Sequence, residues 1–240
     1  MMNKAEKFVT MFVAFVGGLS GVWGAYTAYD ASKNKQPLDE HEQIAESFKS
    51  QISSADRRND EKEVRRVSLL YERYEERWRA ARHVAKIVEP IENLAAYKLS
   101  PEATNDLRVA LTTASQGEGE ILLPNKTLGA AYFALGDYQQ AKNHLNVASV
   151  TEKDTATYAL QAAVYGRLAN GTSDPNTKTA YVEAAIKSLT SAHQMAAGQD
   201  EKLYTFVADD PELKTLVSER DHEIFVPPRI LKSDDSSGSR

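Results

Sequence analysis

The chain of 240 residues contains no cysteine. This absence excludes disulfide bonds, thiol nucleophiles and metal sites with cysteine ligands. A basic excess is missing too, because 34 acidic residues outnumber 29 lysines and arginines and give a formal net charge of −5 at pH 7. A general nucleic-acid binder needs a basic surface to release counterions from phosphates. We therefore expect no nucleic-acid partner.

The motifs of common catalytic sites are also lacking. The sequence has no P-loop, no GxGxxG fingerprint and no GxSxG nucleophile elbow. Its five histidines are His41, His83, His144, His193 and His222. None has a partner at zinc-ligand spacing, and the acids Glu118 and Glu120 stand between glycines, which is typical of a solvated turn. We expect no enzyme activity, no cofactor and no metal site.

One long uncharged run extends from Phe8 to Tyr29, between Lys7 and Asp30. A helix of this length rises about 33 Å at about 1.5 Å per residue, close to the roughly 30 Å hydrocarbon core of a bilayer. Aromatic residues gather at its end, as in an interfacial belt: Trp23, Tyr26 and Tyr29. The pattern predicts a short tail over 1–7 and a transmembrane helix over 8–29.

A cleaved signal peptide is the alternative interpretation of this run. Lys4 and Lys7 would then form its basic n-region, but the run is long for a signal peptide and lacks a good small-x-small cleavage site. The side of the membrane is less determined, because two lysines precede the run and two follow it. The very short N-terminal tail favours a bacterial inner-membrane protein with its C-terminal domain in the periplasm.

Small residues form a stripe on one face of the predicted transmembrane helix. They are Gly17, Gly21, Gly24 and Ala28, and the first two make a GxxxG match. Such stripes let two membrane helices approach closely, although glycine is also simply common in membrane helices. The stripe makes a homo-oligomer possible, with these residues as the packing surface.

A polar linker over 30–60 follows, with a first amphipathic helix after Pro37. Its apolar face is Ile44, Phe48, Ile52 and Ala55. A second helix is predicted from about Asp60 to Pro90, because apolar residues recur at alternating three- and four-residue spacing. They are Val64, Val67, Tyr71, Tyr74, Trp78, Ala81, Ala85 and Val88. The spacing is that of a coiled coil, which would form a homodimer.

Packing onto a globular domain is the other interpretation of this heptad pattern, and we favour it. Aromatic residues are poor knobs in a two-stranded coil, and Leu70, Val84, Ile87 and Ile91 widen the apolar stripe. Ser100, Pro101 and Glu102 then start another helix, as a capping serine, a first-turn proline and an acid. We expect segment 61–115 to pack on the domain that follows.

The stretch from Leu128 to Ala141 has the pattern of two antiparallel helices. Gly129 and Ala141 are small where helices must approach, and Gly136-Asp137 supplies the turn. This stretch resembles the tetratricopeptide repeat, and with the membrane run the chain resembles a membrane-anchored bacterial protein of that type. A degraded second copy is visible from 155, with a turn-rich insertion over Asn170–Asn176.

The resemblance implies an all-α fold, namely a short array of tetratricopeptide-like repeats over 121–197 that forms an α-solenoid. It also implies capping helices over 198–226. Asp210-Pro211 opens the second of these helices. The last segment, 227–240, has little apolar content and is expected to be disordered.

The resemblance further implies a concave groove lined by the first helix of each pair, where a protein or peptide partner binds. The groove candidates are Lys126, Ala130, Phe133 and Arg167. Some relatives grip a peptide carboxylate with lysine and asparagine, but Ala130 replaces that asparagine. Phe133 could anchor a partner in the groove, and burial between the repeats is the interpretation of Phe133 that we favour. The hypothesis is a non-catalytic, membrane-anchored scaffold or assembly factor; the alternative is a structural protein that self-associates through the glycine stripe and the 64–88 heptad pattern.

Overall fold

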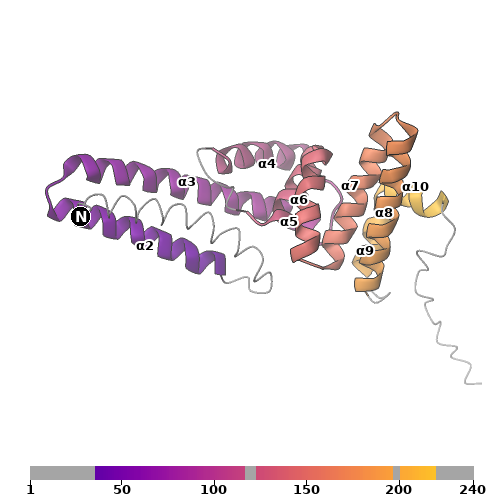
Figure 1. The fold of residues 1–240 in the computed structure, drawn as a ribbon, viewed down its shortest axis with the longest axis horizontal. Coiled ribbons are helices and arrows are strands. Elements are labelled where there is room, and N and C mark those ends of the chain that lie inside the picture. The colour runs from indigo at the N-terminus through magenta and orange to yellow at the C-terminus, as the bar shows by residue number, and fades with distance from the viewer. Residues whose placement is uncertain (1–35, 117–122, 197–200, 220–240) are drawn as a thin grey trace, which may run out of the picture.

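A computed structural model of the chain describes residues 36–116, 123–196 and 201–219 (Figure 1). These residues form α-helices and no strand, so the predicted all-α class is confirmed for the described part. The helices are α2 (Gln36–Arg57), α3 (Glu61–Glu92), α4 (Pro101–Ala114), α5 (Asn125–Leu135), α6 (Tyr138–Thr151), α7 (Thr155–Gly171), α8 (Pro175–Met195), α9 (Glu201–Asp209) and α10 (Pro211–Glu219).

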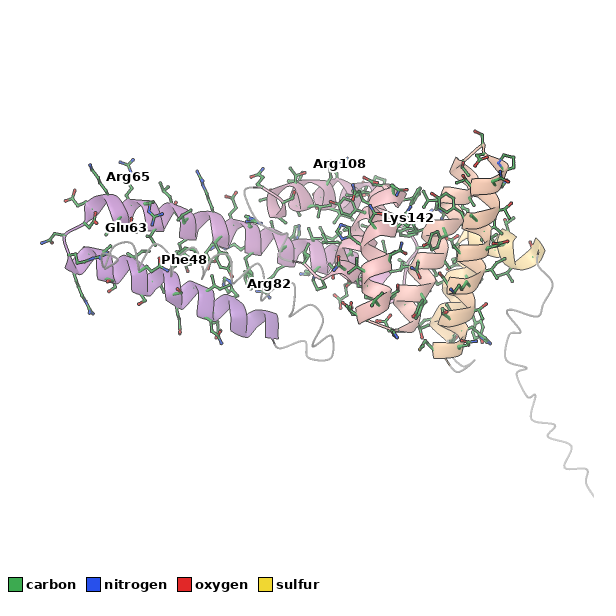
Figure 2. The ribbon with its side chains drawn as sticks, in the orientation of Figure 1. Phe48, Glu63, Arg65, Arg82, Arg108 and Lys142 are labelled. Carbon is green, nitrogen blue, oxygen red and sulfur yellow. The ribbon has the colours of Figure 1, made fainter. Side chains whose placement is uncertain are left out.

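The helix α2 lies antiparallel along the first half of α3 and forms an elongated hairpin with it (Figure 1). Asn59 makes the turn with a positive φ of 52°, and Asp60 caps α3 by accepting a hydrogen bond from the Glu63 backbone N–H at 3.1 Å. Phe48 lies between the two helices (Figure 2) and its ring is 5.6 Å from that of Tyr71. The first half of the heptad pattern therefore packs against α2 of the same chain.

The second half of α3 enters the core, where it packs against α4 and α5. Val84, Val88 and Ile91 are each fully buried there. Ser100 caps α4 by accepting a hydrogen bond from the Ala103 backbone N–H at 3.2 Å, as the sequence predicts. The favoured interpretation, packing onto the globular domain, therefore holds for the second half of α3, whereas the first half packs on α2 of the same chain.

The helices α5 and α6 form the predicted antiparallel pair. Gly136 ends α5 in the left-handed region at a φ of 79°, and Asp137 caps α6 by accepting a hydrogen bond from the Gln140 backbone N–H at 3.1 Å. Only glycine enters this backbone region without a steric penalty, which explains the tight turn. The inner face of α6 is fully buried at Ala141, Leu145 and Ala148.

The second pair, α7 and α8, differs from the expectation. The turn-rich insertion predicted over Asn170–Asn176 is mostly helical, because α7 continues to Gly171 and α8 begins at Pro175. Asp174 caps α8 by accepting from the Thr177 backbone N–H at 3.0 Å, and Pro175 takes the first helical position. The extra residues therefore lengthen the helices, to 17 and 21 residues against 11 and 14 in the first pair.

The pairs stack side by side, with α6 against α7, and α9 and α10 both contact α7 (Figure 1). One continuous core joins α3 to α10, and its largest buried side chains include Leu107, Leu145, Leu160, Leu203, Phe206 and Leu213. Among the described helices, none is long and apolar enough to cross a membrane. The predicted transmembrane helix over Phe8–Tyr29, with its stripe Gly17, Gly21, Gly24 and Ala28, lies outside the described residues, as do Glu118, Glu120 and 227–240.

Candidate functional site

Two of the four predicted groove residues are core residues. Ala130 has no exposed surface and Phe133 retains 4%. Phe133 packs against Tyr138 of the next helix, with ring centroids 6.0 Å apart. The expectation that Ala130 lines an open groove is therefore corrected, and Phe133 takes the favoured alternative of burial, because both side chains belong to the hydrophobic core.

Lys126, the third groove candidate, lies at the start of α5 in a cluster of carboxylates. Its Nζ is 2.8 Å from Asp154 Oδ2, and only 17% of its side chain is exposed. Next to it, Thr127 Oγ1 donates to Glu92 Oε1 at 2.6 Å. The lysine thus joins α5 to the start of α7 and leaves little surface for a partner.

The carboxylates around Lys126 have shifted pKa values. Burial raises the pKa of Glu92, against the opposing hydrogen bond from Thr127. Burial likewise raises the pKa of Glu152. Burial alone would also raise the pKa of Asp154, but hydrogen bonds from Lys126 and from the Thr157 backbone N–H outweigh it, so that pKa is lowered. Lys126 is the cation nearest to all three carboxylates, and its only direct ion pair among them is with Asp154.

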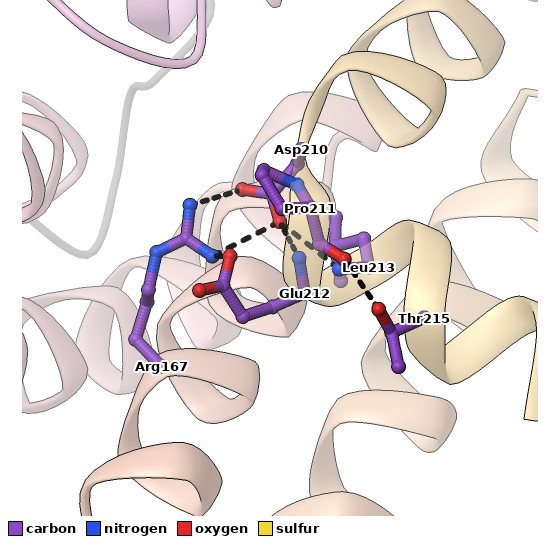
Figure 3. A network of polar contacts seen from close by, with 6 residues as sticks. All are labelled: Arg167, Asp210, Pro211, Glu212, Leu213 and Thr215. Carbon is purple, nitrogen blue, oxygen red and sulfur yellow. Dashed lines mark hydrogen bonds and ion pairs between the residues drawn. The ribbon is translucent and has the colours of Figure 1, made fainter.

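Arg167, the fourth groove candidate, projects from α7 to the start of α10 (Figure 3). Its Nη1 donates to Asp210 Oδ1 at 3.2 Å and its Nη2 donates to Asp210 Oδ2 at 2.9 Å. Glu212 forms a second ion pair with the same guanidinium. The structure therefore brings Arg167 to a specific partner, although that partner belongs to the chain itself.

Asp210 performs two tasks at this contact. Its Oδ1 accepts hydrogen bonds from the backbone N–H of Glu212 at 3.1 Å and of Leu213 at 3.0 Å, so it caps α10. Asp210 has no exposed surface, while 14% of the Arg167 side chain is exposed. Burial raises the pKa of the Asp210 carboxyl, and the Leu213 N–H and Arg167 oppose that shift. The contact is a buried, two-pronged ion pair at a helix N-terminus.

Gly166 precedes Arg167 on α7 and lies against the same helix, α10. The sequence alone did not reveal this contact. A Cβ placed on Gly166 would lie 3.3 Å from the Glu212 Cβ and 3.5 Å from Leu216 Cδ1. The missing side chain lets α10 approach α7 closely. We define the α7 site as Gly166 and Arg167 together with the contacts they make to Asp210, Glu212 and Leu216.

A polar network crosses the helices next to the α7 site. Gln161, buried on α7, donates to Asn146 Oδ1 on α6 at 2.7 Å and accepts from Ser188 Oγ on α8 at 3.1 Å. Tyr165 also donates to Asn146 Oδ1, at 3.0 Å. Because buried polar atoms need partners, this network fixes the register of three helices. Lys142 of α6, labelled in Figure 2, places its Nζ 5.7 Å from the centre of the Tyr181 ring on α8.

A surface cleft of about 440 Å³ lies in the α2–α3 hairpin, and sequence reasoning missed it. His41 stacks on Trp78 with ring centroids 3.6 Å apart, and its Nε2 is 3.4 Å from Glu75 Oε1. Arg82 lies 4.8 Å from the Trp78 ring. The His41 contacts join α2 to α3, whereas Arg82 and Trp78 both belong to α3. The heptad pattern did not predict that a histidine of α2 would pack on Trp78.

The described side chains contain no cluster of acids and histidines that could hold a metal ion. His144 and His193, for example, each contact a polar or aromatic neighbour: Asn125 Oδ1 lies 2.9 Å from His144, and the Tyr204 hydroxyl lies 3.4 Å from His193. In comparisons with known proteins, no family model, no curated protein and no solved structure matches this chain. The resemblance to tetratricopeptide repeats therefore stays a prediction from the residues.

Proposed function

We propose that this chain is a non-catalytic, membrane-anchored helical-repeat protein that binds a partner protein as a scaffold or assembly factor. The observation that supports this most directly is the stacking of two antiparallel helix pairs, α5–α6 and α7–α8, into one continuous core. Stacked helix pairs build an extended surface that suits protein recognition. The tetratricopeptide-like motif from Leu128 to Ala141 supports the same function.

The proposed anchor is the uncharged run Phe8–Tyr29, placed in a bacterial inner membrane with the C-terminal domain in the periplasm. An anchor confines the array to the bilayer surface and so raises the local concentration of membrane-associated partners. The α2–α3 hairpin begins shortly after this run and extends away from the repeat pairs (Figure 1). Because α2 is antiparallel to α3, the start of α2 lies beside the middle of α3, where His41 stacks on Trp78. The proposed anchor therefore precedes the hairpin on the side of the array and not at the far turn.

Proximity labelling in cells tests this function. A labelling enzyme is fused after Arg240 in the full chain, and the same fusion is made in an Ala141→Trp variant. Ala141 is fully buried between α5 and α6, so the variant should disrupt the pair by overpacking while the anchor is unchanged. We expect the intact chain to label a set of periplasmic neighbours. The variant, present at equal abundance, should not label them. Identical neighbours for both chains would contradict recognition by the array.

Self-association is the alternative function, and the same experiment bears on it. The described structure buries Val67, Ala81 and Val88 of the heptad pattern within one chain, which leaves the glycine stripe as the remaining basis for the oligomer of this alternative. The mass of the detergent-solubilised full chain is compared with that of a chain beginning at Asp39. The alternative would be favoured if the full chain is an oligomer and the chain beginning at Asp39 is a monomer. Proximity labelling should then label only other copies of the same chain.

A further inference from the structure

The exposed face of α6 carries no charged side chain. Its exposed residues are amides and valines: Gln139, Gln140, Asn143, Asn146, Val147 and Val150. By contrast, α2, α3, α4, α8, α9 and α10 each expose at least one charged side chain. Gln140, Asn143, Val147 and Val150 follow one another at three- and four-residue spacing and therefore form one stripe along the helix, which we call the α6 stripe.

The structure turns both basic residues of α6 away from the α6 stripe. Lys142 places its Nζ 5.7 Å from the centre of the Tyr181 ring on α8. His144 lies on the other side, with its Nδ1 2.9 Å from Asn125 Oδ1. No acidic residue occurs within α6. The stripe is therefore uncharged along its whole length, and no charge from its own helix leans over it.

The valines of the α6 stripe have a different setting from other exposed apolar side chains. Val150 is 73% exposed and Val147 is 49% exposed, one helical turn apart. Val109 on α4 is similarly exposed, at 60%, but it stands between the exposed charges of Asp106 and Arg108. Single apolar residues among charges are normal on a protein surface. A depletion of charged residues marks the centre of an interface, and the α6 stripe has that composition.

The chemistry of the α6 stripe favours a second copy of the same chain as the occupant. Each copy has a formal net charge of −5, so two copies repel one another except where their charges are kept apart. An amide side chain both donates and accepts hydrogen bonds, so amides pair with amides, whereas a carboxylate does not pair with a carboxylate. A two-fold contact places the same patch on both sides. An uncharged stripe of amides and valines is complementary to itself.

We propose that a second copy of this chain docks on the α6 stripe, with the two α6 helices antiparallel about a two-fold axis between Asn143 and Val147. One helix against one helix is a small contact beside a standard interface of about 1,600 Å². The contact is therefore weak in dilute solution. It rests on the membrane anchor of the proposed function, which confines the copies to one surface and raises their effective concentration.

Crosslinking of single cysteines in membranes tests this contact in the full chain. The chain has no cysteine, so each introduced thiol is unique. Val147→Cys is compared with Val109→Cys and Met195→Cys, because the three native side chains are 49%, 60% and 50% exposed. Membranes that contain each variant are treated with a flexible bismaleimide, and the dimer is quantified on a denaturing gel. We expect at least fivefold more dimer for Val147→Cys than for either control.

Equal crosslinking of the three variants would overturn the inference, because a dimer held by the anchor alone brings all exposed thiols together without preference. A Val147→Cys product that contains a different protein and no dimer would also overturn it, since another occupant would then cover the stripe.

A charge exchange separates a contact between copies from damage to the fold. Val147→Lys and Val147→Glu are each made in a chain that carries Val150→Cys as the reporter. Either charged variant alone should give at least tenfold less dimer than the Val150→Cys chain, because like charges then face one another. Production of both charged variants in the same cells should restore the dimer to within about twofold. Loss without restoration, or no loss in either variant, would overturn the inference.

The membrane pellet distinguishes a failure of this inference from a failure of the proposed function. A chain that sediments with the membranes but shows no preference for Val147→Cys would refute the docked second copy and leave the proposed function standing. A chain that stays out of the pellet would contradict the proposed anchor. The same three cysteine variants, concentrated in solution, would then decide whether the α6 stripe binds a second copy.

Discussion

Leu145 of α6 lies directly over Gly129 of α5. A Cβ placed on Gly129 would be 2.5 Å from Leu145 Cγ and 2.7 Å from its Cδ2. Leu145 is fully buried and has neighbours on its other sides in the core, so it cannot simply move away. The glycine is therefore needed for the close approach of the two helices, as expected for the small position of a tetratricopeptide-like pair.

Gly129→Ala should destabilise the protein although alanine is the better helix former. The gain in helix propensity is up to about 1 kcal/mol, whereas overpacking a dense core costs about 1–3 kcal/mol. We expect a net loss of about 1 kcal/mol, measured by urea unfolding. The matched control is Gly171→Ala, at an exposed helix end with no atom within 4 Å, which should be neutral or stabilising. Equal effects of both substitutions would contradict the close approach.

Gly136→Ala should also cost stability, for a backbone reason. Gly136 has a φ of 79° and open space around its Cβ position, so strain rather than crowding is the obstacle. The left-handed region costs a non-glycine residue about 1–2 kcal/mol, and asparagine tolerates it best. Thermal unfolding should rank the wild type first, then Gly136→Asn, then Gly136→Ala. An alanine variant as stable as the wild type would show that this turn is not formed.

Arg167→Met should be one of the most destabilising single substitutions in the described structure. It leaves the fully buried Asp210 carboxylate without its counter-ion, which costs about 3 kcal/mol or more. Adding Asp210→Ser removes the orphaned charge and keeps a helix cap. Chemical unfolding of the double variant should therefore show a smaller loss than Arg167→Met alone. Strictly additive losses would mean that the two side chains do not interact.

Glu92→Gln should change how stability depends on pH. Burial raises the pKa of Glu92 in the folded state, so its contribution is most favourable below the unfolded pKa of about 4.3 and is lost as pH rises through the folded value. Glutamine keeps the acceptor for Thr127 and does not titrate. Urea unfolding between about pH 4 and pH 7 should show a smaller loss of stability for the variant as pH rises, because only the wild type carries the raised pKa of Glu92.

Asp154→Asn provides the opposite case near the same lysine. The pKa of Asp154 is lowered in the folded state, so its stabilisation is complete above the unfolded pKa and is lost as pH falls through the folded value. The variant should be less stable than the wild type at pH 7, and the difference should shrink in acid. If Glu92→Gln and Asp154→Asn showed the same sign of pH dependence, the assigned roles of the two carboxylates would be wrong.

Much of the fold could be predicted from local patterns. Ser100-Pro101 and Gly136-Asp137 each mark a helix boundary, because a capping side chain or a glycine acts on the nearest backbone groups alone. The periodic burial of Ala141, Leu145 and Ala148 is equally local in origin, since it follows from the helix repeat. The Asn170–Asn176 insertion was misjudged because its turn-forming residues also make good helix caps and first turns.

The candidate site could not be predicted in the same way. Phe133 and Arg167 each lie on the first helix of a pair and were both expected to line one groove, yet Phe133 fills the core and Arg167 binds Asp210 at the start of α10. Similarly, His41 stacks on Trp78 only because α2 folds back along α3. Periodicity shows which face of a helix is apolar, but it does not show which element covers that face.

The sequence by itself determined the all-α class, most helix boundaries, the small positions of the α5–α6 pair and the absence of cysteine chemistry, because each depends on composition or on neighbours within a few residues. The tertiary structure decided how the surfaces are used. It assigned the heptad pattern of α3 to contacts within the chain, buried Ala130 and Phe133, and placed α10 on Gly166 and Arg167. Each of these outcomes depends on which distant helix packs on a given apolar or charged face, and that is determined by the packing of the whole chain.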